Sequence, residues 1–235
     1  MEQSVVATTR DAFALTLFKD SISLSPGEKA EMVAHILQSA ERAAGVMPKP
    51  DGTSWTGDTQ GHEFLFRNPL FDDLQRKIGS IIRDYVEELD VDSSRIDFYY
   101  QRSWATVTQR DEHIYAHKHL QSHISFAYYL LKPESSGDLQ FTMQEVPNEF
   151  SPMVFGTSKP ESGLIRNLTL RNTKVLNVEA KEGDILVFPS KILHATQPNM
   201  SDNPRISISG DVTVMLKDST GHEFMMPNFR NWQQF

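Results

Sequence analysis

The hydrophobic pattern of the chain changes character at Ile96. From that point on, short runs rich in β-branched and aromatic residues are separated by turn residues such as Pro133, Gly137 and Pro198. Runs of this kind, with no helical spacing between them, are typical of a β-sandwich or barrel. The predicted strands span residues 96–107, 117–131, 138–143, 174–180, 185–188, 192–196 and 205–216.

Helical spacing is confined to the part of the chain before that change. Ser25, Pro26 and Glu28 predict a capping box with proline at the first helical position, and Gly45 predicts the end of this helix. An apolar stripe at steps of four predicts a second helix over 68–89. Both apolar faces are expected to cover a sheet. Residues 150–171 predict a long loop, and loops of this length are often active-site lids.

Composition and charge exclude several classes of protein. The chain has 235 residues and no cysteine, which excludes disulfides, zinc–thiolate sites, iron–sulfur clusters and cysteine nucleophiles. Its net charge of −8 argues against a groove that follows nucleic-acid phosphates. Residues 1–20 lack the apolar core of a signal peptide, and no apolar run is long enough to cross a membrane. We expect a cytoplasmic protein without a nucleic-acid or membrane partner; a homo-oligomer is compatible with the sequence.

Candidate metal ligands come from the histidines, four of which lie within 113–123. His117 and His119 would face the same side of a strand with their Cα atoms about 6.5–7 Å apart, close enough to converge on one metal ion. Two solvated histidines would show the same pattern. His194 follows an apolar strand and can supply a third ligand, although a hydrogen-bonded core histidine would also fit. His113 and His123 are expected to be exposed.

Arg205 and Ser207 predict an anion site near these histidines. They share one face of the last predicted strand, whereas Ile206 and Ile208 make the other face apolar. An inward-pointing arginine is costly unless it meets an anion, and its planar fork suits a carboxylate. A surface salt bridge is the alternative for Arg205 alone. The ordered set favours a site that binds 2-oxoglutarate end to end, with one end on the metal and the other at Arg205 and Ser207.

The ordered motifs resemble the 2-oxoglutarate/Fe(II) oxygenase superfamily, and more narrowly a group of mostly uncharacterised oxygenases from marine bacteria and phages. The resemblance covers roughly half of the chain and implies a mostly β fold with N-terminal helices: a double-stranded β-helix core, of the jelly-roll or cupin-like type, flanked by helices. We expect a single domain over 1–235, with a helical part at 1–95, the core at 96–216 and a C-terminal tail at 217–235. The motifs are Trp104, His117-x-His119, 125–130, 137–141, 183–190, His194 and Arg205-x-Ser207.

The resemblance also implies roles for single residues. The superfamily pattern is His-x-Asp/Glu followed by a distal His, so the metal ligands would be His117, His119 and His194. A histidine at position 119 departs from that pattern and leaves the iron centre one unit more positive. The upstream carboxylates at 111 and 112 have the wrong spacing to replace it. Tyr129 and Ser125, which share a strand face, are expected to bind 2-oxoglutarate, with Tyr129 beside its distal carboxylate. A core aromatic is the alternative for Tyr129.

The activity implied by the resemblance is that of a dioxygenase, which uses Fe(II), 2-oxoglutarate and O₂. It would hydroxylate a C–H bond of a small-molecule or peptidyl substrate and release succinate and CO₂. Two alternatives stay open. One is a three-histidine cupin-like dioxygenase that does not use 2-oxoglutarate, in which Arg205 binds a substrate carboxylate. The other is a non-catalytic barrel that binds a metal or an anion. No motif identifies the substrate or distinguishes hydroxylation from another oxidative outcome.

Overall fold

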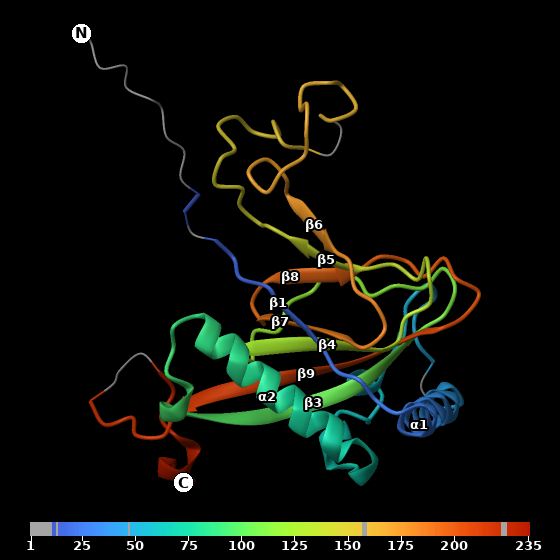
Figure 1. Ribbon diagram of the computed structural model, residues 1–235, viewed down its shortest axis with the longest axis vertical. Coiled ribbons are helices and arrows are strands. Elements are labelled where there is room, and N and C mark those ends of the chain that lie inside the picture. The colour runs from blue at the N-terminus through green and yellow to red at the C-terminus, as the bar shows by residue number, and fades with distance from the viewer. Residues whose placement is uncertain (1–10, 13, 47, 157–158, 222–224) are drawn as a thin grey trace.

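Two antiparallel sheets form the body of the protein (Figure 1). The computed structural model describes residues 11–12, 14–46, 48–156, 159–221 and 225–235; the first ten residues, half of the segment considered for a signal peptide, lie outside this range. The larger sheet has the order β1-β7-β4-β9-β3-β2, and the smaller has the order β6-β5-β8. The strands are β1 (Phe18–Ser21), β2 (Trp55–Thr56), β3 (Ile96–Thr108), β4 (Ile124–Leu131), β5 (Leu139–Thr142), β6 (Val175–Val178), β7 (Asp184–Pro189), β8 (Leu193–Thr196) and β9 (Arg205–Leu216).

Two helices, α1 (Pro26–Ala44) and α2 (Asp72–Glu88), pack against the larger sheet, and α2 lies across it in Figure 1. The predicted capping box is present: the Ser25 hydroxyl accepts from the Glu28 N–H, and the Glu28 carboxylate accepts from the Ser25 N–H. The second helix begins later than predicted because Asn68 caps a separate 3-10 turn before it. Among the described residues, no helix is long and apolar enough to cross a bilayer. The 3-10 turns are Gly57–Thr59, Leu65–Arg67, Pro69–Phe71, Ser93–Arg95 and Phe229–Asn231.

Strand alternation divides the interior into two apolar clusters. On β4, Phe126 and Tyr128 point toward the helices and join the larger cluster. Ala127 and Tyr129 point the other way and pack with side chains of β5 and β7. Because successive side chains of a strand face opposite sides, the second cluster lies between the two sheets. The polar residues assigned to the site lie on this same inner side.

The predicted strand over 117–131 is wrong in its first half. Only Ile124–Leu131 is regular strand. The N–H and C=O of His117 instead exchange hydrogen bonds of 2.9 Å with those of His194, and the His119 N–H donates to the Ser190 carbonyl at 2.9 Å. This segment therefore leaves the larger sheet and pairs with residues at and before β8.

The N-terminal part also supplies strands, which the hydrophobic pattern did not predict. Strand β1 pairs with β7 and β2 pairs with β3, each at an edge of the larger sheet. The first has mostly exposed residues and the second has two residues, too few for a periodic signal. The predicted long loop is confirmed, since the described part of 150–171 contains turns and no regular element; its role as a lid stays a prediction.

Candidate metal and co-substrate site

A row of polar side chains runs along the inner face of β9. Arg205, Ser207, Ser209 and Asp211 occupy alternate positions, so they share the face that looks toward the smaller sheet. The row spans about 20 Å at the usual rise per residue. In register, Tyr129 of β4 lies beside Ser207. The last strand therefore carries a guanidinium at one end of the row and a carboxylate at the other.

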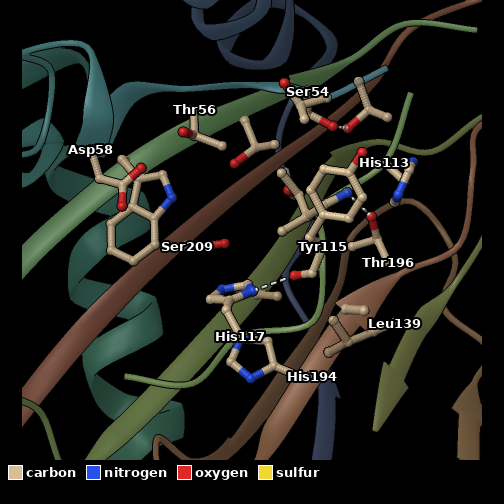
Figure 2. Close-up of a pocket in the computed structure, with 18 of the residues that line it drawn as sticks. Ser54, Thr56, Asp58, His113, Tyr115, His117, Leu139, His194, Thr196 and Ser209 are labelled. Carbon is tan, nitrogen blue, oxygen red and sulfur yellow. Dashed lines mark hydrogen bonds between the residues drawn. The ribbon is translucent and has the colours of Figure 1, made fainter. Parts of the chain in front are cut away.

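A cavity of about 350 Å³ opens over this row. Its size is in the range of small-ligand sites. Figure 2 shows the rings of His117 and His194 together at one end of the pocket, with His113 and Thr196 toward the other. The cavity is lined by every residue that the sequence assigned to the site, namely His117, His119, Ser125, Tyr129, His194, Arg205 and Ser207.

The structure brings His117, His119 and His194 into one cluster. Their ring centroids are 4.3 Å apart for His117 and His194, 5.0 Å for His117 and His119, and 5.2 Å for His119 and His194. One ring nitrogen of each lies within 4.8 Å of the other two. The backbone pairing of 117 with 194 produces this convergence, although 117 and 119 are not in a regular strand.

The hydrogen bonds of two rings fix their tautomers. Nδ1 of His117 lies 2.8 Å from the Tyr115 carbonyl (Figure 2), and Nδ1 of His194 lies 2.8 Å from the Ile192 carbonyl. A carbonyl oxygen can only accept, so each Nδ1 carries the hydrogen. The Nε2 lone pairs are then free, which is the form in which a neutral imidazole binds a metal.

The electrostatics of the cluster favour neutral rings. Burial, together with the neighbouring His117, lowers the pKa of His194 to about 3. Burial also lowers the pKa of His117. Both rings are therefore neutral at neutral pH, with one nitrogen of each available as a ligand. Three imidazole nitrogens suit iron, copper, nickel or zinc rather than magnesium or calcium, so the donor set fits Fe(II).

His119 has a different partner, Asp211, which the sequence analysis missed. Its Nδ1 lies 2.5 Å from Oδ1 of Asp211, a fully buried carboxylate that also binds Arg102 at 2.5 and 3.1 Å. Burial raises the pKa of Asp211, but the hydrogen bonds from His119 and Arg102 outweigh it and lower the pKa to about 2. The signal was present in the sequence: Asp211 continues the period of two that begins at Arg205.

Arg205 is a buried cation held by neutral groups. It is 2% exposed. Nη1 donates to the carbonyls of Ser136, Gly137 and Gln197, while Nη2 donates to the Thr196 hydroxyl at 2.9 Å. Among the described residues, no carboxylate lies within ion-pair distance of it. Burial lowers the pKa of this guanidinium. Such a site lacks the negative charge that normally accompanies a buried arginine.

Tyr129 and Ser207 lie beside this cation with free hydroxyls. Burial raises the pKa of Tyr129 to about 12, so the phenol stays protonated and can donate a hydrogen bond. Within the described part of the chain, neither hydroxyl has a hydrogen-bond partner, although both side chains line the cavity. Ser125 differs, because it bonds Ser190 at 2.8 Å and approaches Asp211 at 3.4 Å. It lies at the histidine end of the cavity.

The remaining candidates lie outside the cluster. Glu112 forms an ion pair with Lys49, and Asp111 is exposed at a positive φ of 64°. Neither replaces His119 as a neighbour of the other two histidines. His123 is exposed and accepts from a backbone N–H. His113 is half-buried and lines the cavity, contrary to the expectation that it is exposed.

Comparison with known proteins gives one family and a set of similar folds. Residues 102–211 match the family described as "Putative 2OG-Fe(II) oxygenase". No curated protein matches the sequence. Similar solved structures include HygX from Streptomyces hygroscopicus with nickel, 2-oxoglutarate and hygromycin B bound (TM-score 0.54, 13% identity, 85% of this chain and 83% of that chain). The carbocyclase SnoK from nogalamycin biosynthesis is also similar (TM-score 0.54, 12% identity, 88% of this chain and 85% of that chain). So is a Pseudomonas putida prolyl-4-hydroxylase (TM-score 0.50, 13% identity, 84% of this chain and 92% of that chain).

The structural likenesses concern the fold, because the identities are low. They confirm the predicted class, a mostly β protein with a double-stranded β-helix core. The family match begins at Arg102 and ends at Asp211, so it contains all three clustered histidines and the buried arginine.

Proposed function

We propose that this chain is a 2-oxoglutarate-dependent oxygenase of the 2-oxoglutarate/Fe(II) superfamily and binds Fe(II) through His117, His119 and His194. With 2-oxoglutarate and O₂ as co-substrates, it hydroxylates a C–H bond of a small-molecule or peptidyl substrate and releases succinate and CO₂. The assignment is supported by the family match and by a cavity that holds three clustered imidazoles and a buried cation.

The single observation that carries the proposal is the unpaired Arg205 in the same cavity as the histidines. A buried guanidinium surrounded by carbonyls and hydroxyls is costly without an anion. A dicarboxylate with a 2-oxo group could bind at both the histidines and the arginine. Its oxo-acid end can chelate a metal held by the histidines, and its distal carboxylate can accept hydrogen bonds from Arg205. Tyr129 and Ser207 have free hydroxyls beside that position and would donate to the same carboxylate.

The residues that line the cavity have different roles at its histidine end and at its Arg205 end. His117 and His194 present Nε2 because backbone carbonyls hold their Nδ1 hydrogens. Bound there, Fe(II) would supply the O₂ chemistry that side chains cannot perform. Arg205, Tyr129 and Ser207 would fix the orientation of the co-substrate, and the walls between the two sheets would exclude bulk water from the reacting end.

A second function is favoured by one observation, the histidine at position 119. A three-histidine site without a carboxylate ligand also fits a cupin-like dioxygenase, in which Arg205 would bind a carboxylate of the substrate itself. The two functions differ in their need for 2-oxoglutarate, which can be measured directly.

The test is an anaerobic titration followed by exposure to O₂. Fe(II) is added to the purified protein, then 2-oxoglutarate, and the visible absorbance band of a metal-chelated 2-oxo acid is recorded. We expect a saturable band in the wild type, loss of Fe(II) binding in His119→Ala, and loss of 2-oxoglutarate binding in Arg205→Ala. On exposure to O₂ we expect succinate to form.

Each contrary outcome has its own meaning. O₂ uptake with candidate substrates in the absence of 2-oxoglutarate would favour the second function. Fe(II) binding with no 2-oxoglutarate-dependent band and no succinate would indicate a non-catalytic metal-binding barrel. Absence of Fe(II) binding would contradict both enzymatic functions.

A further inference from the structure

Within the part of the chain that the structure describes, the cluster of candidate ligands contains no carboxylate. Position 119 holds an imidazole, and the nearest nitrogens come from His117, His119 and His194. Neutral imidazoles leave the charge of a divalent cation uncompensated inside the protein. A buried cation is expected to have an anionic partner nearby, so the question is which group supplies it.

Asp211 is placed to supply this charge through His119. The three rings differ in what holds Nδ1: backbone carbonyls hold His117 and His194, whereas a carboxylate oxygen 2.5 Å away holds His119. A carboxylate that accepts from a ligand's second nitrogen fixes the ring's tautomer and orientation and makes the ring a more basic ligand.

The surroundings of Asp211 hold its carboxylate in one position. Oδ2 accepts from Arg102 at 2.5 and 3.1 Å and from Gln121 at 3.1 Å. Oδ1 accepts from Ser122 at 3.0 Å as well as from His119. In the β4–β9 register, Asp211 lies opposite Ser125, whose hydroxyl approaches at 3.4 Å. This network directs one oxygen at the histidine and the other at the arginine.

We propose that Asp211 is a positioning residue that supplies, from behind His119, a negative charge that three imidazole ligands lack. Asp211 holds the His119 ring with Nε2 toward the metal and brings one negative charge to the centre. The inference rests on the proposed metal site and adds a residue to it.

The competing explanation is that Asp211 serves only the fold, as the buried partner of Arg102. The two roles give different expectations when the residue at 119 is changed. His119→Asp removes the ring that Asp211 contacts and puts a carboxylate at position 119 itself. If Asp211 acts through His119, Asp211→Asn should weaken Fe(II) binding in the wild type and change it little beside the introduced carboxylate, whereas a role in the fold alone should give the same weakening in both backgrounds.

The experiment measures the Fe(II) dissociation constant anaerobically in the wild type, in Asp211→Asn, in His119→Asp and in the double variant. We expect Asp211→Asn to weaken binding about 10- to 100-fold in the wild-type background, the usual effect of removing such a partner. In the His119→Asp background the same change should alter the dissociation constant by less than about threefold, because the ring that Asp211 contacts is absent. Arg102→Gln is the comparison variant, because it breaks the ion pair with Asp211 and keeps the carboxylate beside His119. Since Arg102 helps to hold that carboxylate in place, we expect Fe(II) binding to weaken, but less than in Asp211→Asn.

The outcomes separate the two roles. Equal weakening in both backgrounds, or the same weakening in Arg102→Gln as in Asp211→Asn, would show that Asp211 acts through the fold, and the inference would be wrong. Thermal unfolding of each metal-free variant shows how much of any change is loss of folded protein. If the folded wild type does not bind Fe(II), the proposed function itself is wrong. If the wild type binds Fe(II) and Asp211→Asn binds it equally well, only the inference about Asp211 is wrong.

Discussion

The change Arg205→Met removes the buried guanidinium and keeps a long apolar side chain in its place. In the wild type, the cation is 2% exposed and has no carboxylate partner among the described residues. If the distal carboxylate of 2-oxoglutarate is that partner, the variant leaves a buried carboxylate unpaired. Breaking such a pair costs about 3–5 kcal/mol, which corresponds to roughly 200- to 5,000-fold weaker binding.

The assay compares two ligands on the same Fe(II)-loaded, anaerobic protein. One is 2-oxoglutarate; the other is 2-oxopentanoate, which has the same chain length and a methyl group in place of the distal carboxylate. The variant should lose affinity for the first by the factor above and keep its affinity for the second within about threefold, since only the first pairs with a buried charge. Arg205→Lys should fall between wild type and Arg205→Met, because an ammonium keeps the charge without the fork.

The comparison of ligands also controls for damage to the fold. Nη1 of Arg205 donates hydrogen bonds to the carbonyls of Ser136, Gly137 and Gln197, and the variant loses them. We therefore expect the variant to be less stable. A loss of stability would lower the apparent affinity for both ligands by the same factor. Equal losses for 2-oxoglutarate and 2-oxopentanoate would therefore refute the role of Arg205 as the carboxylate anchor.

Three further predictions concern the pH dependence, the co-substrate contact and the strand packing. Burial lowers the pKa of His194 to about 3, below its unfolded value, so below pH 6.5 the unfolded state binds a proton that the native state does not. The metal-free protein should therefore lose about 2 kcal/mol of stability between pH 7 and pH 5, measured by urea unfolding, and His194→Gln should flatten this slope. Tyr129→Phe should weaken 2-oxoglutarate binding by about 1 kcal/mol without loss of thermal stability, because within the described residues its hydroxyl has no protein partner; unchanged affinity would contradict the contact. Gly210→Ala should destabilise the protein by about 1–3 kcal/mol, because a Cβ would lie 2.5 Å from the Phe126 ring and 2.9 Å from the Arg102 carbonyl; an unchanged unfolding midpoint would contradict this packing.

The strands with strong alternation could be predicted from the sequence. The strand predicted over 205–216 is β9 with the same bounds, because its apolar face is continuous and Pro204 marks its start. The same alternation placed Arg205 and Ser207 on one inner face. The helix after Ser25 was also predictable, since its capping box is encoded within four consecutive residues.

Other features depend on long-range pairing that local pattern does not encode. His117 and His119 lie in a segment whose backbone bonds go to His194 and Ser190, about seventy residues later in the chain. Strand alternation predicted that His117 and His119 converge, and they do, but not because they lie in a regular strand. Alternation places Asp211 on the same inner face as Arg205, but its role could not be predicted, because its partners are distant in sequence. Arg102 lies on β3 and His119 in the loop before β4.

The most direct test of the whole account is a crystal structure of the protein grown anaerobically with Fe(II) and 2-oxoglutarate. We predict one iron bound by Nε2 of His117, His119 and His194, with the oxo-acid end of 2-oxoglutarate on the iron and its distal carboxylate on Arg205. An iron bound without one of these imidazoles, or a 2-oxoglutarate whose distal carboxylate lies away from Arg205, would contradict it.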